Sequence, residues 1–286
     1  MSSLFDHLGH AALWSRGFRR RWIPTPVGRA HVLEAPGRGA GPPVVLLAGF
    51  TSRATNFSRM APRLLPHVSR VSVLDLPGHG DSDLPDDGLT GDSLHAGVMA
   101  ALHDLTRDPA VIFGNSVGGW MALSHTLAHP ESVRGLVLAS PFGAQMTADE
   151  VVALREVYRV ESHADALDMV DRVFHAPPAW FRPVLAWFAR RQIARPELMN
   201  LLDSLRAELT LTQEQLAALR VPTRILWGRS DGILPREHLA WFRQALPRAT
   251  FEEPEDYGHS PFMERPADVA ARVVGFVEGL GVRGLV

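Results

Sequence analysis

The chain has 286 residues, of which 46% are hydrophobic and 21% are charged. It contains neither lysine nor cysteine, so its 29 basic residues are all arginines, against 31 acidic ones. These absences exclude Schiff-base lysines, P-loop lysines, thiol nucleophiles, disulfides and cysteine-ligated zinc. A formal net charge of −2 disfavours a nucleic-acid partner. A covalent catalyst of this composition would need an oxygen or imidazole nucleophile.

The N-terminal residues 4–14 carry apolar side chains at helical spacing, and four arginines follow between Arg16 and Arg21. Such a helix could touch a membrane surface, but packing against the body of the protein is the favoured interpretation. The segment lacks the basic start of a signal peptide, and no apolar run reaches the roughly 18 residues of a membrane span. We therefore expect a cytoplasmic protein with no integral membrane segment.

Residues 22–143 alternate between short apolar runs and helical patterns. Residues 22–25 and 30–34 flank a Pro-Val-Gly turn and predict a hairpin. Apolar runs typical of buried parallel strands follow at 44–48, 71–76, 110–113 and 136–139. Helical patterns lie between them at 56–65, 92–106 and 117–128. This alternation predicts an α/β fold with a mostly parallel, doubly wound sheet.

Residues 144–220 interrupt the alternation, because they show helical periodicity and no convincing strand. An insertion of this length is too long for a plain connection. The strand pattern resumes at 223–227, and a helix at 235–245, a strand at 250–253 and a helix at 266–280 complete the chain. We therefore expect three parts: an N-terminal core part at 1–143, a helical cap (lid) at 144–220 and a C-terminal core part at 221–286.

Residues 114–119 read Gly-Asn-Ser-Val-Gly-Gly and contain a G-x-S-x-G string between a predicted strand and a predicted helix. The flanking glycines permit a sharp turn, called the elbow below, from which Ser116 projects. The backbone N–H of Val117, at the start of the helix, would point to where an oxyanion forms. The string by itself is weak, and its strand-turn-helix context is what makes Ser116 a candidate nucleophile.

Two further strand ends supply the groups that a serine nucleophile needs. Asp231 follows the strand at 223–227, and His259 follows the strand near 250–253. A serine requires a base to remove its proton, and the base requires a carboxylate to orient it. Ligands of open α/β sheets bind where strands end, so Ser116, Asp231 and His259 are the predicted catalytic set.

The sequence resembles the α/β-hydrolase fold superfamily from about residue 40 to 280. The resemblance lies in the motifs at 75–82, 114–119, 228–235 and 258–266. It implies Ser116 as nucleophile, His259 as base and then acid, and Asp231 as the orienting carboxylate. It also implies a second oxyanion donor at the backbone N–H of Phe50. The chain has Ala48-Gly49 where the family commonly has His-Gly, and Asp75 is expected to be a structural partner for the turn at 78–80.

In this family a helical cap roofs the active site, which makes its aromatic residues candidates for substrate contact. The candidate substrate-binding residues are Asn115, Trp120, Phe142, Trp180 and Trp187. An apolar lid over a serine favours an apolar acyl or aromatic substrate. We expect a small-molecule substrate, no cofactor and no metal, and the sequence predicts no oligomeric state.

The expected function is a serine hydrolase that cleaves a carboxylic ester, lactone or thioester through an acyl-enzyme. Two alternatives stay open. One is a carbon–carbon bond hydrolase of the ring-cleavage-product type, suggested by the Gly-Asn-Ser elbow and by Asn56-Phe57. The other is a non-enzymatic ligand-binding member of the fold. Dehalogenase chemistry is disfavoured because the elbow carries Ser116 where those relatives carry aspartate.

Overall fold

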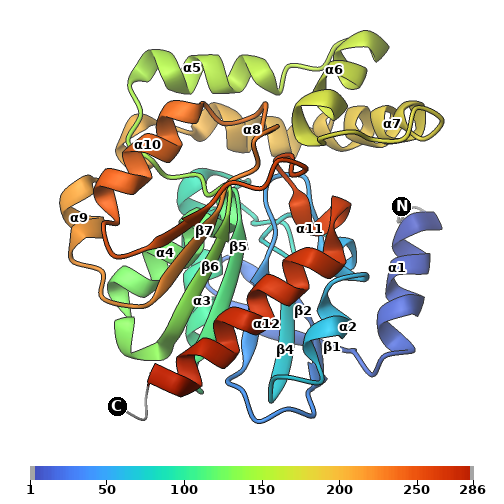
Figure 1. Cartoon of the computed structure of the whole chain (residues 1–286). Helices are drawn as coiled ribbons and strands as arrows, with labels where there is room; N and C mark the ends of the chain where they lie inside the picture. Colours follow the sequence, from blue (N-terminus) through green and yellow to red (C-terminus); the bar gives the residue numbers. More distant parts are fainter. Residues whose placement is uncertain (1–3, 284–286) are drawn as a thin grey trace.

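The computed structural model describes residues 4–283 (Figure 1). These residues contain one eight-stranded sheet in the order β1-β2-β4-β3-β5-β6-β7-β8. β2 is antiparallel to both β1 and β4, whereas all other neighbouring pairs are parallel. The predicted α/β fold class is therefore confirmed. The strands are β1 Arg19–Thr25, β2 Gly28–Pro36, β3 Val44–Leu47, β4 Arg70–Leu74, β5 Ala110–Asn115, β6 Val133–Ala139, β7 Thr223–Leu226 and β8 Thr250–Glu252.

Helices cover both faces of this sheet and bury the central strands completely. Every residue of β3 and β5 is buried, and alternate side chains enter two different cores. One core packs against α3 Gly91–Leu105, α4 Val117–Ala128 and α10 Arg236–Ala245. The other packs against α1 Leu4–Trp14, α2 Ala61–Leu64 and α12 Pro266–Arg283. Burial on both faces explains why these strands are continuous apolar runs in the sequence.

Two sequence-based boundaries are wrong. The helix expected at 56–65 is divided into the short helix η1 Ala54–Phe57 and α2, because Pro62 lies in the first turn of α2, where its missing N–H is tolerated. Arg19, Arg20 and Arg21 belong to β1 rather than to a basic flank of the first helix. Two short helices, η2 Pro130–Ser132 and α11 Pro261–Glu264, were not expected.

The 144–220 segment is helical and lies at one end of the sheet (Figure 1). Side-chain capping boxes begin α5 and α6, where Thr147 pairs with Glu150 and Ser162 pairs with Asp165. Most of its buried apolar residues join the core on the α3 and α4 side of the sheet, whereas Ala166, Val170 and Ala186 form a small cluster of their own. Its helices are α5 Ala148–Val157, α6 His163–Val173, α7 Arg182–Ile193, α8 Pro196–Ser204, η3 Ala207–Leu209 and α9 Gln213–Ala217.

The N-terminal helix α1 packs against the body of the protein beside η1, with its N-terminal end toward α7 (Figure 1). Gly9 approaches η1 so closely that a Cβ atom there would lie 2.8 Å from Thr55 Cβ. Leu13 is buried, whereas Phe5, Leu8 and Trp14 are exposed. No helix within residues 4–283 has the length and apolar character needed to cross a membrane.

Candidate active site

Ser116 occupies a strained turn between β5 and α4. Its φ of 53° and ψ of −119° lie in a region that residues with side chains rarely adopt. The turn is closely packed, because a Cβ on Gly114 would lie 2.5 Å from Gly118 O and a Cβ on Gly118 would lie 2.6 Å from Leu47 O. The elbow predicted at G-x-S-x-G is therefore present, and it leaves Ser116 with 4% of its surface exposed.

Asp231 and His259 meet beyond the ends of β7 and β8. His259 Nδ1 lies 2.9 Å from Asp231 Oδ2, and the two side chains are 5% and 1% exposed. The other carboxylate oxygen of Asp231 accepts hydrogen bonds from the N–H groups of Ile233 at 2.9 Å and Leu234 at 3.2 Å. Burial opposes ionisation, but the facing imidazole and the Ile233 N–H hold the pKa of Asp231 below its ordinary value. The carboxylate is thus charged, and His259 Nδ1–H is the donor.

His259 Nε2 is buried and has no hydrogen-bond partner among residues 4–283. The His259 turn is tied to the Ser116 elbow by Asn115, whose Nδ2 donates to His259 O at 2.8 Å and to Ala139 O at 2.9 Å. One amide proton of Asn115 thus joins the elbow to the His259 turn and the other joins it to the end of β6, while Asn115 also lines the larger of two cavities described below, so its expected contact with substrate stays a prediction.

The loop at 49–53 lies against the elbow. A Cβ on Gly49 would be 2.9 Å from Ser116 Cβ, so the backbone beside Phe50 passes next to the serine. Val117 is the first residue of α4, where helix N–H groups point outward and attract negative charge. The Phe50 ring meets Tyr158 of the 144–220 segment edge to face, with 4.9 Å between the ring centroids. The structure therefore brings the backbone at Phe50 and Val117 to the same place as Ser116.

Two cavities adjoin these residues. The larger one has a volume of about 400 Å³ and is lined by Asn115, His259 and apolar side chains of α6 and α7. The smaller one, of about 20 Å³, is lined by Ser116, Val117, Trp120, Phe142 and leucines of the 144–220 segment. Phe50 and Tyr158 line both cavities and therefore stand between them.

Trp180 and Trp187 do not line either cavity. Their side chains are 79% and 53% exposed, and the adjacent Phe181 and Phe188 face the larger cavity instead. Successive residues of a helix project about 100° apart, so Phe188 faces inward where Trp187 faces solvent. The aromatic side chains that line the cavity thus come from the expected stretch, but they are Phe181 and Phe188 rather than Trp180 and Trp187.

Sequence reasoning also missed residues that reach the site through the fold. Tyr158 lines both cavities, and Phe5 and Asp6 of α1 line the larger one although they lie far away in sequence. Burial and the nearby Asp231 charge raise the pKa of Tyr158, so its hydroxyl stays protonated. Tyr158 follows Leu154 at the i, i+4 spacing of a helix face, which is a signal for burial, whereas nothing in the sequence connects α1 with this cavity.

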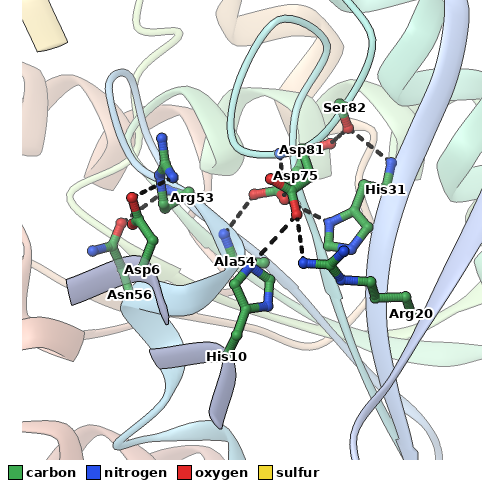
Figure 2. A network of polar contacts seen from close by, with 10 residues as sticks. All are labelled: Asp6, His10, Arg20, His31, Arg53, Ala54, Asn56, Asp75, Asp81 and Ser82. Atoms are coloured by element: carbon green, nitrogen blue, oxygen red, sulfur yellow. Dashed lines mark hydrogen bonds and ion pairs between the residues drawn. The ribbon is translucent and has the colours of Figure 1, made fainter. Parts of the chain in front are cut away.

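Asp75 has the structural role expected for it (Figure 2). Its carboxylate accepts hydrogen bonds from Ala54 N at 2.6 Å and Asp81 N at 3.1 Å, and it contacts His31 Nδ1 at 2.7 Å. A Cβ on Gly80 would lie 2.1 Å from Asp75 Cγ, so the turn wraps tightly around the carboxylate. Among the described residues no group of three or more His, Asp or Glu side chains is arranged to hold a metal ion.

Comparison with known proteins places these features in context. Residues 44–272 match the model of the alpha/beta hydrolase family. The pimeloyl-[acyl-carrier protein] methyl ester esterase of Aromatoleum aromaticum is 30% identical over 255 residues, which cover 83% of this chain and 99% of that protein. Lipase 1 of Psychrobacter immobilis is 26% identical over 261 residues, covering 87% of this chain and 81% of the relative. The crystal structure of a membrane phospholipase A has a TM-score of 0.80 at 25% identity, and the match covers 97% of this chain and 91% of that one.

Proposed function

This chain belongs to the alpha/beta hydrolase family, and we propose that it is a serine hydrolase that cleaves carboxylic esters with Ser116, His259 and Asp231. The observation that carries the proposal is the buried His259–Asp231 contact of 2.9 Å at the strand ends beside the Ser116 elbow. A carboxylate held ionised against one ring nitrogen makes the other nitrogen a base. The curated relatives named above, an esterase and a lipase, agree with ester chemistry.

The proposed reaction has two halves. His259 Nε2 takes the proton of Ser116 Oγ as that oxygen attacks the ester carbonyl, and His259 then gives the proton to the departing alcohol. Water next attacks the acyl-enzyme while His259 Nε2 takes its proton, and His259 then returns that proton to Ser116 Oγ as the acyl–oxygen bond breaks and the carboxylic acid leaves. Asp231 keeps the ring in the required tautomer and stabilises the imidazolium in both halves.

The backbone N–H groups of Phe50 and Val117 are the proposed oxyanion donors. Two observations support them: Gly49 packs against the Ser116 side chain, and Val117 begins α4. Donors fixed in place before the reaction stabilise the developing charge without having to reorganise. The loss of one such donor in other enzymes costs about 10²–10³-fold in kcat.

The cavities favour an ester with an apolar acyl or aromatic group. Trp120, Phe142 and several leucines surround the smaller cavity, and Phe181, Leu185 and Phe188 line the larger one. We propose that the 144–220 segment acts as the cap of this site, since residues from it contribute to both cavities. Substrate choice would then depend on the side chains of α6, α7 and α8.

The test is Ser116→Ala, assayed with a short p-nitrophenyl ester. We expect kcat to fall by at least about 10³-fold while the far-UV circular dichroism and Tm stay close to those of the wild type. Full retention of activity by the folded variant would remove Ser116 from the mechanism. Esters, lactones, thioesters and ring-fission products should be assayed side by side. Turnover of the ring-fission products alone would favour carbon–carbon bond hydrolysis. Binding of a compound without any turnover would favour a non-enzymatic ligand-binding protein.

A further inference from the structure

Helix α1 lies outside residues 44–272, which match the family model, yet it contacts the loop that carries Phe50. We propose that Asp6 of α1 is a positioning residue for ester hydrolysis. Through its ion pair with Arg53, it fixes the 49–53 loop and hence the Phe50 N–H. This inference rests on the proposed function, because it explains what holds one of the proposed oxyanion donors in place.

The Asp6–Arg53 ion pair joins α1 to the 49–53 loop (Figure 2), and it is largely shielded from solvent. Arg53 Nη1 lies 2.7 Å from Asp6 Oδ2, and the two side chains are 15% and 11% exposed. Ion pairs at fully exposed positions contribute little because water and salt screen them. At this degree of burial the interaction is stronger, and leaving either charge without the other is costly. The pair can therefore hold Arg53 in one position.

The backbone next to Arg53 is fixed by two further hydrogen bonds (Figure 2). Arg53 N donates to Asn56 Oδ1 at 2.8 Å, and Ala54 N donates to Asp75 Oδ1 at 2.6 Å. Both contacts hold the end of the loop that enters η1. The Asp6 contact is the one that comes from α1, and it acts on the Arg53 side chain rather than on the backbone.

The loop needs such contacts because its backbone is strained. Thr51, the residue after Phe50, has a φ of 67°, which is costly for a β-branched side chain. Strain of this kind persists only where the surrounding structure imposes it. If an anchor is lost, we expect the loop to relax and the Phe50 N–H to move away from the oxyanion position.

Helix α1 is itself held firmly enough to act as an anchor. Gly9 lies against Thr55 with no room for a side chain, since a Cβ would be 2.8 Å from Thr55 Cβ. The Phe5 ring meets Phe188 of α7 edge to face, with centroids 4.9 Å apart. Phe5 and Asp6 also line the larger cavity, so α1 forms part of the wall of the site.

The experiment compares Asp6→Asn, Arg53→Gln and the double variant with the wild type, using a short p-nitrophenyl ester. An oxyanion donor acts in the transition state, so we expect kcat to fall about 10-fold with KM changed less than about 2-fold. Because both substitutions break the same contact, the kcat of the double variant should be no lower than the kcat of the less active single variant.

Asp81→Asn is the matched control. The Asp81 carboxylate lies 3.4 Å from His10 of α1 and 3.1 Å from Arg20 of β1, but it does not contact the 49–53 loop. This substitution should change Tm slightly and leave kcat at the wild-type value. An equal loss of kcat in Asp81→Asn would mean that general loosening of the N-terminal region causes the effect, and would overturn the proposal.

Other outcomes are equally decisive. Wild-type kcat in folded Asp6→Asn, an effect confined to KM, or additive losses in the double variant would each overturn the positioning role. If Asp6→Asn does not fold, Arg53→Gln decides by the same criteria. An inactive Ser116→Ala together with a fully active Asp6→Asn would reject this inference and leave the proposed function intact, whereas an active Ser116→Ala would reject the proposed function itself.

Discussion

At the residue scale, backbone strain gathers at the ends of three neighbouring strands. Among the described residues, the non-glycine positions with positive φ are Thr51, Ser116 and Ser140, at 67°, 53° and 41°. They follow β3, β5 and β6, and they surround the candidate site. Strained residues cluster at functional sites because the surrounding structure must hold them there. Of the three, only Ser116 stood out in the sequence, because glycines on both sides of it indicated the turn.

The buried side chain of His79 makes the stability of the protein depend on pH. Burial lowers its pKa to about 4, although Nδ1 contacts Pro77 O at 2.9 Å. Between pH 6.5 and pH 4 the unfolded chain would be protonated at this histidine and the folded chain would not. The unfolding free energy therefore falls as the pH drops through that window. The contribution of His79 to the unfolding free energy should be about 2 kcal/mol lower at pH 5 than at pH 7.

The measurement is urea denaturation of the wild type and His79→Asn at pH 7 and pH 5. His125, whose pKa burial also lowers to about 4, remains in both proteins and cancels in the comparison. We expect the variant to lose less stability than the wild type on acidification. Equal losses in the two proteins would show that His79 is not the group that titrates.

At the element scale, the elbow between β5 and α4 depends on close backbone approach. A Cβ on Gly118 would lie 2.6 Å from the carbonyl oxygens of Leu47 and Ala48, which belong to the neighbouring strand and its end. Since backbone atoms cannot move aside cheaply, Gly118→Ala should lower the unfolding free energy by about 2 kcal/mol or more. The change should appear as a lower Tm in thermal denaturation.

Gly275→Ala is the control for the elbow substitution. Gly275 lies within α12 with no atom within 4 Å of the added Cβ, so the same chemical change relieves a helix-breaking residue. It should leave the unfolding free energy unchanged or raise it by up to about 1 kcal/mol, so Tm should stay the same or rise. A fall in Tm as large as that of Gly118→Ala would show that the elbow has no special packing requirement.

Single elements were predictable where one periodicity dominated. The buried strands are short apolar runs because both sheet faces are covered, and α3 and α4 follow clear helical patterns. The helix expected at 56–65 was wrong because Pro62 starts a new helix rather than continuing the previous one. Boundaries of this kind depend on local capping, which hydrophobic spacing does not report.

At the scale of the whole molecule, the strand ends were enough to indicate which polar residues would lie together. Asp231 and His259 are 28 positions apart and in contact, as the fold class implied. The position of α1 against η1 and α7 was not predictable. It depends on the shape of Gly9 against Thr55 and on the Asp6–Arg53 pair, and neither leaves a periodic pattern in the sequence.

The central claim is that Ser116 is the nucleophile activated by His259, and fluorophosphonate labelling followed by peptide mass spectrometry tests it most directly. The chain has no lysine or cysteine to compete for the reagent. The account predicts a single adduct on Ser116 that is absent in Ser116→Ala and forms far more slowly in His259→Ala. An adduct on another residue, or labelling that is unchanged in His259→Ala, would contradict it.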